Sequence, residues 1–404
     1  MWRTEFAATG RVKYFIKKKL DKKVRNQKVA SMRSFLLTFL TTYYGATLFV
    51  VLHTFDLLKP FKLKYVIVLC YILLSTAVFL GRFWGNHFPL NISAWLARIG
   101  YVWMGLLVYM FVWSLTFLIL RLFKIGPVLN KSRLILFLFE VILVFIILVI
   151  GYINANTVRI TKHKLETSKQ VSLRVVQITD NHLGFMNSEY RFSKIVEKIR
   201  TLEPDILLIT GDFLENEHDY AIKNDIGRAL RNMKLSMGIY AITGNHEYIA
   251  NIDKSMEYME SLGIVMLRDE VKIFEDESLR LIGREDTSKE RRYNKPNQTL
   301  EYLLKQGDDN GDLFTIVMDH QVKKHNEYEV EAIDLVISGH THYGQLFPFN
   351  LVTKRIFDIA YGLEKWGNTY MYVSSGTGVW GPPMRLGTRS EIVVFDIVPT
   401  ASRR

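Results

Sequence analysis

The chain has 404 residues, enough for two domains, and its hydrophobic content of 49% is ordinary for a globular protein. The net charge is +12, but eleven Lys and Arg lie within residues 1–34, beside only Glu5 and Asp21. Because no basic stripe continues beyond this tail, anionic lipid headgroups are a better partner for it than nucleic acid. The single cysteine, Cys70, excludes an intramolecular disulfide.

Four long apolar segments occupy the first 155 residues. Each is close to the roughly 20 residues that a helix needs to cross the hydrocarbon core of a bilayer. Four buried helices of a soluble core would leave too little polar surface between them to face water. Glu140 is the only charged residue inside these segments, and it needs a partner or a place near the interface. We therefore expect four transmembrane helices, at residues 34–55, 65–81, 99–120 and 134–153.

The Lys and Arg beside these segments predict the orientation, because cytoplasmic loops retain such residues. With the N-terminus inside, the cytoplasmic side holds seventeen of them and the opposite side seven. The tail supplies most of this difference, and the short loops taken alone favour the opposite orientation. We expect a multi-pass protein of the cell inner membrane with a cytoplasmic C-terminal half. The tail itself has apolar residues at helical spacing from Val12 to Val24, so it is either a helix on the membrane surface or a solvated segment.

After about residue 158, short β-branched segments alternate with amphipathic ones, which predicts an α/β domain. Reactive side chains follow the ends of the strands, where an α/β sheet places its ligands. The charged segment 283–296 lacks periodicity and is expected to be a loop, whose basic residues would meet substrate anions or face solvent. Strands are expected at 173–179, 205–210, 238–243, 279–283, 314–318, 335–338, 370–374 and 391–398, and a helix at 191–202.

Five clusters of metal-binding residue types each follow an apolar strand. Their carboxylate oxygens, amide oxygen and imidazole nitrogens suit first-row divalent metals and are too rich in nitrogen for calcium. A lone histidine usually has an ordinary structural role, but a set repeated after successive strands indicates a shared site. The clusters are Asp180 and His182 in DNH, Asp212 in GDF, Asn245 and His246 in GNHE, His320 in MDH, and His340 and His342 in GHTH.

In this order the clusters resemble the pattern D-x-H, G-D, G-N-H-[DE], H, G-H-x-H of the calcineurin-like metallophosphoesterase superfamily. The resemblance covers about residues 171–398. Segment 372–392, YVSSGTGVWGPPMRLGTRSEI, is also similar to the C-terminal signature of the bacterial membrane-anchored branch. Asn181, Glu247 and Tyr343 replace a usual leucine, aspartate and glycine, but none of these is a metal ligand in the pattern.

The resemblance implies a fold, a domain arrangement and a cofactor. The expected fold is a four-layer α-β-β-α sandwich preceded by a four-helix transmembrane region. The expected domains are a basic cytoplasmic tail at 1–33, transmembrane helices at 34–156, the phosphoesterase domain at 157–398 and a short tail at 399–404. The implied cofactor is a pair of divalent metal ions, either Mn, Fe or Zn.

Residue roles also come from the resemblance. Metal-bound hydroxide would attack a phosphate ester or phosphoanhydride, with Asp212 bridging the two ions. Asp180 and His246 are the expected catalytic residues; His246 would stabilise phosphoryl oxygens or protonate the leaving group. Arg385 is a candidate phosphate contact. One ion would be held by Asp180, His182, Asp212 and His342, and the other by Asp212, Asn245, His320 and His340.

The sequence leaves the substrate and the oligomeric state open. A lipid-linked phosphate, a soluble phosphorylated small molecule and a phosphoprotein are all compatible with a tethered site. Two other classes of function also remain: a non-catalytic membrane scaffold that binds a phosphorylated partner, and a regulatory domain of a transport or sensing protein. The latter requires more polar groups within the membrane segments than Glu140 alone.

Overall fold

The computed structural model describes residues 33–34, 36–123, 133–307, 311–321, 327–328 and 332–400, so the predicted tail at 1–33 lies almost wholly outside the described residues. Four described helices are long and apolar enough to cross a membrane, which confirms the expected apolar N-terminal region. They are the first helix (Leu36–Leu57), α2 (Leu63–Phe83), α3 (Leu90–Leu122) and α4 (Arg133–Asn156).

Helix α3 begins nine residues before the expected segment and includes Arg98. The expected segment began directly after this charge. In the structure the guanidinium of Arg98 donates to the carbonyl oxygen of Phe185, at 2.8 Å, and to the hydroxyl of Tyr220, at 3.0 Å. The charge is therefore accommodated by polar groups of the C-terminal half, and the helix continues through it.

Contacts divide the chain into two units, Met1–Ser75 with Leu107–Glu140, and Thr76–Leu106 with Val141–Arg404. In the first unit, the buried carboxylate of Glu140 lies 3.4 Å from Nε2 of His53 on the first helix. This acidic residue therefore has the kind of partner that a carboxylate at membrane depth needs.

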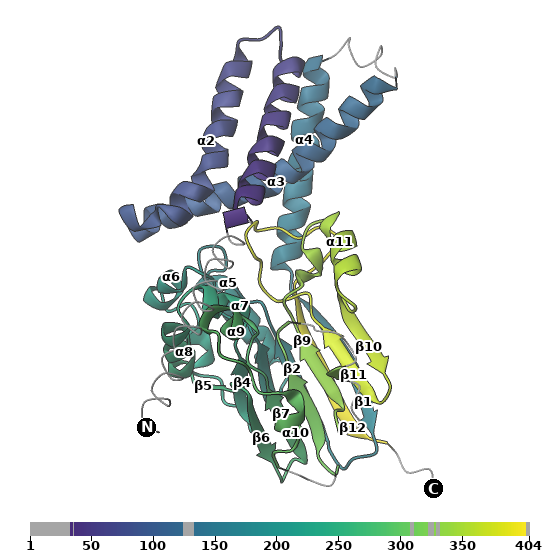
Figure 1. Cartoon of the computed structure of the whole chain (residues 1–404). Helices are drawn as coiled ribbons and strands as arrows, with labels where there is room; N and C mark the ends of the chain where they lie inside the picture. Colours follow the sequence, from purple (N-terminus) through teal and green to yellow (C-terminus); the bar gives the residue numbers. More distant parts are fainter. Residues whose placement is uncertain are drawn as a thin grey trace, which may run out of the picture. The chain divides into compact units, whose positions relative to one another are not determined.

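The second unit contains two six-stranded sheets (Figure 1), ordered β1-β12-β2-β3-β4-β5 and β10-β11-β9-β8-β7-β6. The strands β2, β3, β4 and β5 run parallel in the first sheet, as do β7, β8, β9 and β11 in the second. The carboxyl ends of parallel strands meet at one edge, which places the loops after them together. The first sheet comprises β1 (Arg159–Thr167), β2 (Leu173–Ile178), β3 (Ile206–Thr210), β4 (Gly238–Ile242), β5 (Ile264–Met266) and β12 (Glu391–Pro399). The second comprises β6 (Glu270–Phe274), β7 (Leu279–Gly283), β8 (Phe314–Met318), β9 (Leu335–Ser338), β10 (Gly362–Trp366) and β11 (Thr369–Val373).

Three apolar cores join these sheets and their helices into four layers. Between the sheets, Leu208 of β3 belongs to the same buried cluster as Ile316 of β8. On the outer face of the first sheet, β2, β3 and β4 pack against α5 (Glu189–Arg200) and α8 (Ile252–Ser261). On the outer face of the second sheet, Leu303 of α10 (Leu300–Leu304) packs against β7, β8 and β9. The expected α-β-β-α sandwich is therefore confirmed.

The structure corrects some local expectations. Segment 283–296 is not all loop, because it contains the short helix α9 (Ser288–Tyr293). A helix of six residues with no buried side chain gives no apolar periodicity to detect. The strands β1, β5, β6 and β10 were also missed, since they are short or largely exposed.

Candidate metal centre

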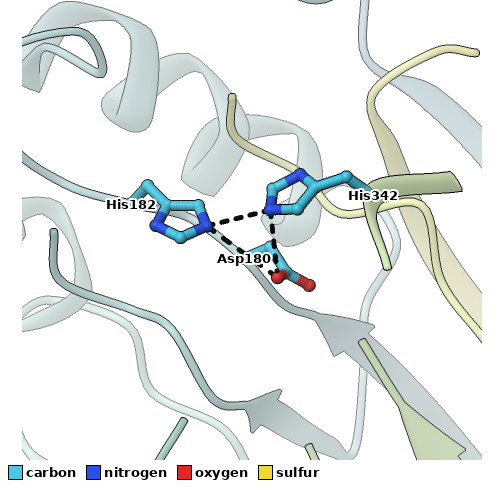
Figure 2. A group of neighbouring side chains, drawn as sticks. All are labelled: Asp180, His182 and His342. Atoms are coloured by element: carbon cyan, nitrogen blue, oxygen red, sulfur yellow. Dashed lines mark hydrogen bonds and ion pairs between the residues drawn. The ribbon is translucent and has the colours of Figure 1, made fainter. Parts of the chain in front are cut away.

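Asp180, His182 and His342 form the first group of side chains at the carboxyl edge of the sheets (Figure 2). Nε2 of His182 lies 3.0 Å from Nε2 of His342, although the two residues are 160 positions apart. Oδ1 of Asp180 lies 3.3 Å from Nε2 of His342 and 3.9 Å from Nε2 of His182. Three potential ligand atoms thus face a common point.

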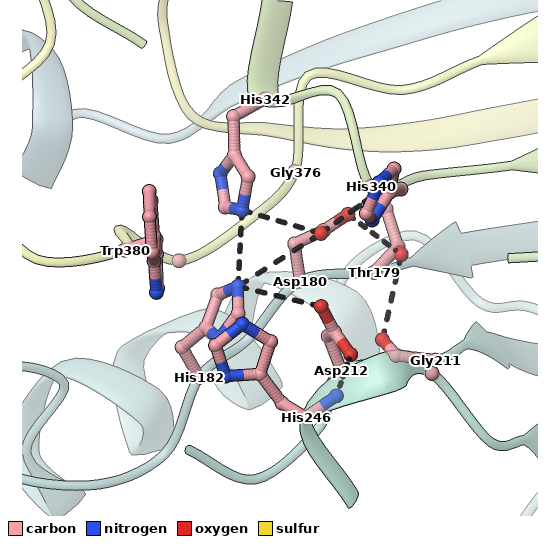
Figure 3. A network of polar contacts seen from close by, with 12 residues as sticks. Thr179, Asp180, His182, Gly211, Asp212, His246, His340, His342, Gly376 and Trp380 are labelled. Atoms are coloured by element: carbon pink, nitrogen blue, oxygen red, sulfur yellow. Dashed lines mark hydrogen bonds and ion pairs between the residues drawn. The ribbon is translucent and has the colours of Figure 1, made fainter. Parts of the chain in front are cut away.

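Asp212, His320 and His340 form the second group. Oδ2 of Asp212 lies 3.1 Å from Nε2 of His320 and 3.9 Å from Nε2 of His182 in the first group. The carboxylate of Asp212 therefore lies between the two groups (Figure 3). The structure thus brings six of the seven expected ligand side chains together.

Asn245, the seventh expected ligand, begins the short helix α7 (Asn245–Ile249). Its Oδ1 is buried and has no hydrogen-bond partner among the described residues. A buried amide oxygen normally has a partner, because an unsatisfied one costs about 1–3 kcal/mol. This orphaned oxygen, two carboxylates and four imidazoles suit a pair of divalent cations, so the residues present fit the implied metal ions.

The backbone of this centre is unusual. Asp180, His182, Asp212, His340 and His342 all have left-handed φ angles, between 44° and 70°. Such conformations are uncommon for residues other than glycine and concentrate at functional sites. The loops therefore turn sharply at the residues that carry the potential ligands.

Two motif glycines allow the ligand loops to approach each other closely. A Cβ atom at Gly244 would lie 2.2 Å from Oδ1 of Asp212, and one at Gly339 would lie 2.3 Å from Oδ2 of Asp180. No side chain fits at either position without moving a carboxylate. The glycines of GNHE and GHTH are therefore required by packing against Asp212 and Asp180.

Acceptors behind the histidines fix the orientation of the rings. Nδ1 of His182 lies 3.0 Å from Oε2 of Glu215, and Nδ1 of His320 lies 2.7 Å from the carbonyl oxygen of Thr210. Because a carboxylate or carbonyl oxygen can only accept, each Nδ1 carries the proton and each Nε2 faces the centre. This arrangement is common for metal-binding histidines.

Electrostatics favour charged carboxylates and a neutral imidazole. Burial alone would raise the pKa of Asp180, but the imidazoles of His342 and His320 together outweigh it and hold that pKa below its ordinary value. The same holds for Asp212, whose pKa is kept well below its ordinary value by His320 and His246 against the effect of burial. Burial lowers the pKa of His342 to about 4. In contrast, burial would lower the pKa of His320, but Asp212 outweighs it and raises that pKa well above its ordinary value, so this imidazole must release a proton to bind a metal ion.

His246 lies beside the two groups and, with His182 and Asp212, forms a third set of side chains close enough to share a metal ion. Its Nδ1 is 2.9 Å from Oε1 of Glu215, its ring meets that of His182 edge to face, and its backbone amide donates to Oδ1 of Asp212. Burial would lower the pKa of His246, but Glu215 and Asp212 outweigh this and raise it to about 9. Trp380, half exposed, borders the same imidazole at 6.1 Å between ring centroids (Figure 3).

Two glutamates for which the sequence predicted no role support the centre. Glu215 contacts both His182 and His246. Glu247, which is fully buried, accepts backbone hydrogen bonds from Asp212, Leu214 and Gly244 and so fixes the loop that carries Asp212. In the sequence, only its place in the GNHE motif indicates that Glu247 contributes to the site.

Arg385, the expected phosphate contact, is fully buried. Its Nη2 donates to the carbonyl oxygens of Ser375, at 2.7 Å, and Gly378, at 2.8 Å. The same nitrogen lies 3.3 Å from Nδ1 of His342. The guanidinium therefore contacts His342, an expected metal ligand, and the backbone of segment 375–378.

Comparisons with known proteins agree with this geometry. The family described as "Calcineurin-like phosphoesterase" matches residues 173–344. An uncharacterized metallophosphoesterase of Helicobacter pylori is 32% identical over 229 residues, which make up 56% of this chain and 60% of that protein. A Bos taurus protein named "Transmembrane protein with metallophosphoesterase domain" is 32% identical over 60% of this chain and 58% of its own length. An uncharacterized metallophosphoesterase of Aquifex aeolicus is 30% identical over 63% of this chain and 98% of its own length. The chain thus spans about 60% of the Helicobacter and bovine relatives.

Proposed function

Since this chain belongs to the calcineurin-like metallophosphoesterases, we propose that it hydrolyses a phosphate ester or a phosphoanhydride at a membrane surface. The observation that supports this most is the convergence of Asp180, His182 and His342 with Asp212, His320 and His340. A set of buried acids and imidazoles around one point has no structural purpose that apolar residues would not serve better.

In this proposal the chain holds two divalent cations. Asp180, His182, Asp212 and His342 would bind one, and Asp212, Asn245, His320 and His340 the other. When bound, the cations would draw charge from the phosphoryl oxygens and lower the pKa of the attacking water.

His246 and Asp180 are the residues for which we propose catalytic roles beside the cations. His246, which is not in either ligand set, would donate a proton or hydrogen bond to the leaving group. Asp180 would hold the charge of the first site and orient the imidazole of His342, 3.3 Å away.

The test is a metal-resolved activity screen of the full-length protein in detergent, with Mn, Fe and Zn added separately. Monoesters, diesters and pyrophosphate lipids serve as substrates, beside the variant Asp212→Asn. We expect hydrolysis of one class and a loss of at least about 100-fold in Asp212→Asn. Unchanged activity in that variant would exclude the two-metal mechanism. A wild type that binds no metal and hydrolyses nothing would instead favour the scaffold or regulatory alternatives.

A cavity supports a lipid-linked substrate as the more specific form of this proposal. It has a volume of about 360 Å³, and its lining includes Asn154, Arg159, Tyr343 and Arg389. Asn154 lies in the last turn of α4, so the cavity adjoins the end of a membrane helix. Within the described ranges, the exposed guanidinium groups of Arg159 and Arg389 form no ion pair, which leaves them available to an anionic headgroup.

The double variant Arg159→Gln/Arg389→Gln tests the lipid-linked form. We expect its KM to rise about 10-fold for a pyrophosphate lipid in vesicles and to stay constant for a soluble chromogenic ester. Lys234→Gln, an exposed charge on the same domain, is the matched control. Equal effects on both substrates would contradict a lipid headgroup site.

We also propose that the phosphoesterase domain is cytoplasmic, because the Lys and Arg of the N-terminal tail favour that side. The chain has one cysteine, so Cys70→Ser gives a background without thiols. In that background, Lys234→Cys should react with a membrane-impermeant maleimide only after the cells are permeabilised. Labelling in intact cells would show that the domain lies on the opposite side of the membrane.

A further inference from the structure

A membrane helix contributes a charge to the network behind the metal centre. Arg82 is the next-to-last residue of α2, and its Nη2 is 3.5 Å from Oε1 of Glu215. Its Nε is 3.1 Å from Oε1 of Glu217, and its Nη1 donates to the hydroxyl of Tyr101 on α3. The guanidinium thus joins two membrane helices to the loop that follows β3, and all of these residues belong to the second unit.

Glu215, the partner of Arg82, also connects two histidines of the centre. Its Oε2 lies 3.0 Å from Nδ1 of His182, and its Oε1 lies 2.9 Å from Nδ1 of His246. One carboxylate therefore sets the tautomer and ring angle of an expected metal ligand and of the histidine expected to act on the leaving group (Figure 3 shows both rings).

This carboxylate is buried, with 7% of the residue exposed. A buried carboxylate needs compensating positive charge. Arg82 is a permanent cation 3.5 Å from Glu215, so it supplies such charge beside the imidazole of His246. Its planar fork can reach Glu215, Glu217 and Tyr101 at once, which a single ammonium group does less well.

We propose that Arg82 is a positioning residue, which holds the carboxylate of Glu215 in place and thereby orients His182 and His246. This role rests on the proposed function. It follows that the membrane helices do more than anchor the enzyme: the end of α2 completes the support of the metal centre. A phosphoesterase domain without that helix would lack the cation behind its histidines.

The experiment uses the full-length protein with Arg82→Gln, Arg82→Lys, Glu215→Gln and the double variant Arg82→Gln/Glu215→Gln. Arg98→Gln is the matched control, since Arg98 also joins a membrane helix to the domain but donates its hydrogen bonds to Phe185 and Tyr220. Steady-state kcat and KM are measured. Metal bound per chain after dialysis at a fixed free concentration is measured separately, by elemental analysis.

We expect Arg82→Gln to lower kcat about 10- to 100-fold, to change KM less than about threefold and to reduce metal retention. Arg82→Lys should recover part of both losses, because it restores the charge without the fork. Glu215→Gln should be at least as impaired as Arg82→Gln. The double variant should be no worse than Glu215→Gln, because Arg82 acts through that carboxylate.

Other outcomes would overturn this role. If Arg82→Gln matched Arg98→Gln in kcat and metal retention, Arg82 would only dock the helices. Additive losses in the double variant would show that Arg82 acts by another route. Should Arg82→Gln fail to fold, the comparison of Arg82→Lys with Arg98→Lys decides by the same criteria. A wild-type protein that binds no metal and has no activity would contradict the proposed function itself. A wild-type protein that is active, with an activity that substitution of Arg82 does not change, would contradict only the role of Arg82.

Discussion

The backbone amide of Arg385 donates a hydrogen bond of 2.9 Å to the carbonyl oxygen of Gly151 in helix α4. The side-chain amide of Asn154, one turn later, donates in turn to the carbonyl oxygen of Arg385 at 3.2 Å. The end of a membrane helix therefore holds the backbone of the residue whose guanidinium lies against His342. Together with Arg82, this gives the second unit two connections from apolar helices to the metal centre.

The first prediction concerns Gly151. A Cβ atom there would lie 2.9 Å from both Cβ and Cε of Met384, the residue before Arg385. Gly151→Leu should displace Met384 and, with it, the guanidinium beside His342, and we expect kcat to fall about 10-fold. Gly45→Leu is the control, because a Cβ atom at Gly45 on the first helix meets nothing within 4 Å. Equal kcat values for the two variants would show that this contact does not affect the site.

The second prediction separates two roles of Arg385. Its buried guanidinium donates hydrogen bonds to several backbone groups, including the carbonyl oxygens of Ser375 and Gly378. Arg385→Ala should therefore reduce the free energy of unfolding by about 2–4 kcal/mol, measured by denaturant titration, and should lower kcat more than it raises KM. A rise in KM at constant stability would support the direct phosphate contact expected from the sequence. If stability, kcat and KM were all unchanged, both roles would be excluded.

The sequence was informative about the side chains that converge at the centre and much less so about the residues that support them. Asp180, His182 and Asp212 could be predicted because residue types that bind metals follow apolar strands in a recognisable order. Glu215 could not, because its importance comes from contacts with His182 and with Arg82, which lies 133 positions away. A charged residue in a loop looks the same in a sequence whether it faces solvent or a buried histidine.

The strands also differ in how well the sequence predicts them. The buried strand β8 reads as an uninterrupted apolar run, and its expected bounds, 314–318, are those observed. Strand β1 has mostly exposed or half-buried side chains, several of them charged, and its pairing partner β12 is the last strand of the described residues. Its position is therefore determined by a long-range pairing that local patterns do not contain.

The third prediction is a pH dependence of stability that arises from Glu217. Burial raises the pKa of Glu217 from 4.5 to about 7, and the neighbouring Glu215 adds to this, while Arg82 and His246 oppose it. The folded state therefore binds this proton more tightly than the unfolded state does. The contribution of Glu217 to stability is most favourable below about pH 4.5 and is lost as the pH rises to about 7.

Glu217→Gln removes this titration. We expect the variant to unfold at a higher temperature than the wild type at pH 8, by a few degrees, and at nearly the same temperature at pH 4.5. Differential scanning calorimetry at the two pH values measures the difference. Asp219→Asn, an exposed acid two residues away, should show no such pH-dependent gain. A variant less stable than the wild type at pH 8 would mean that the ion pair with Arg82 outweighs the burial of Glu217.

The last prediction concerns removal of the metal ions. The carboxylates of Asp180 and Asp212 lie among imidazoles with little solvent, so bound cations should stabilise the fold by mass action, by about 2.7 kcal/mol at 100 times Kd. Chelation followed by dialysis should abolish activity and lower the unfolding temperature, and added metal should restore both. Asp212→Asn should show a much smaller shift on chelation, whereas His218→Gln, which alters a histidine outside both groups, should keep the full shift. An unfolding temperature of the wild type that is insensitive to chelator and to added metal would mean that these side chains hold no cation.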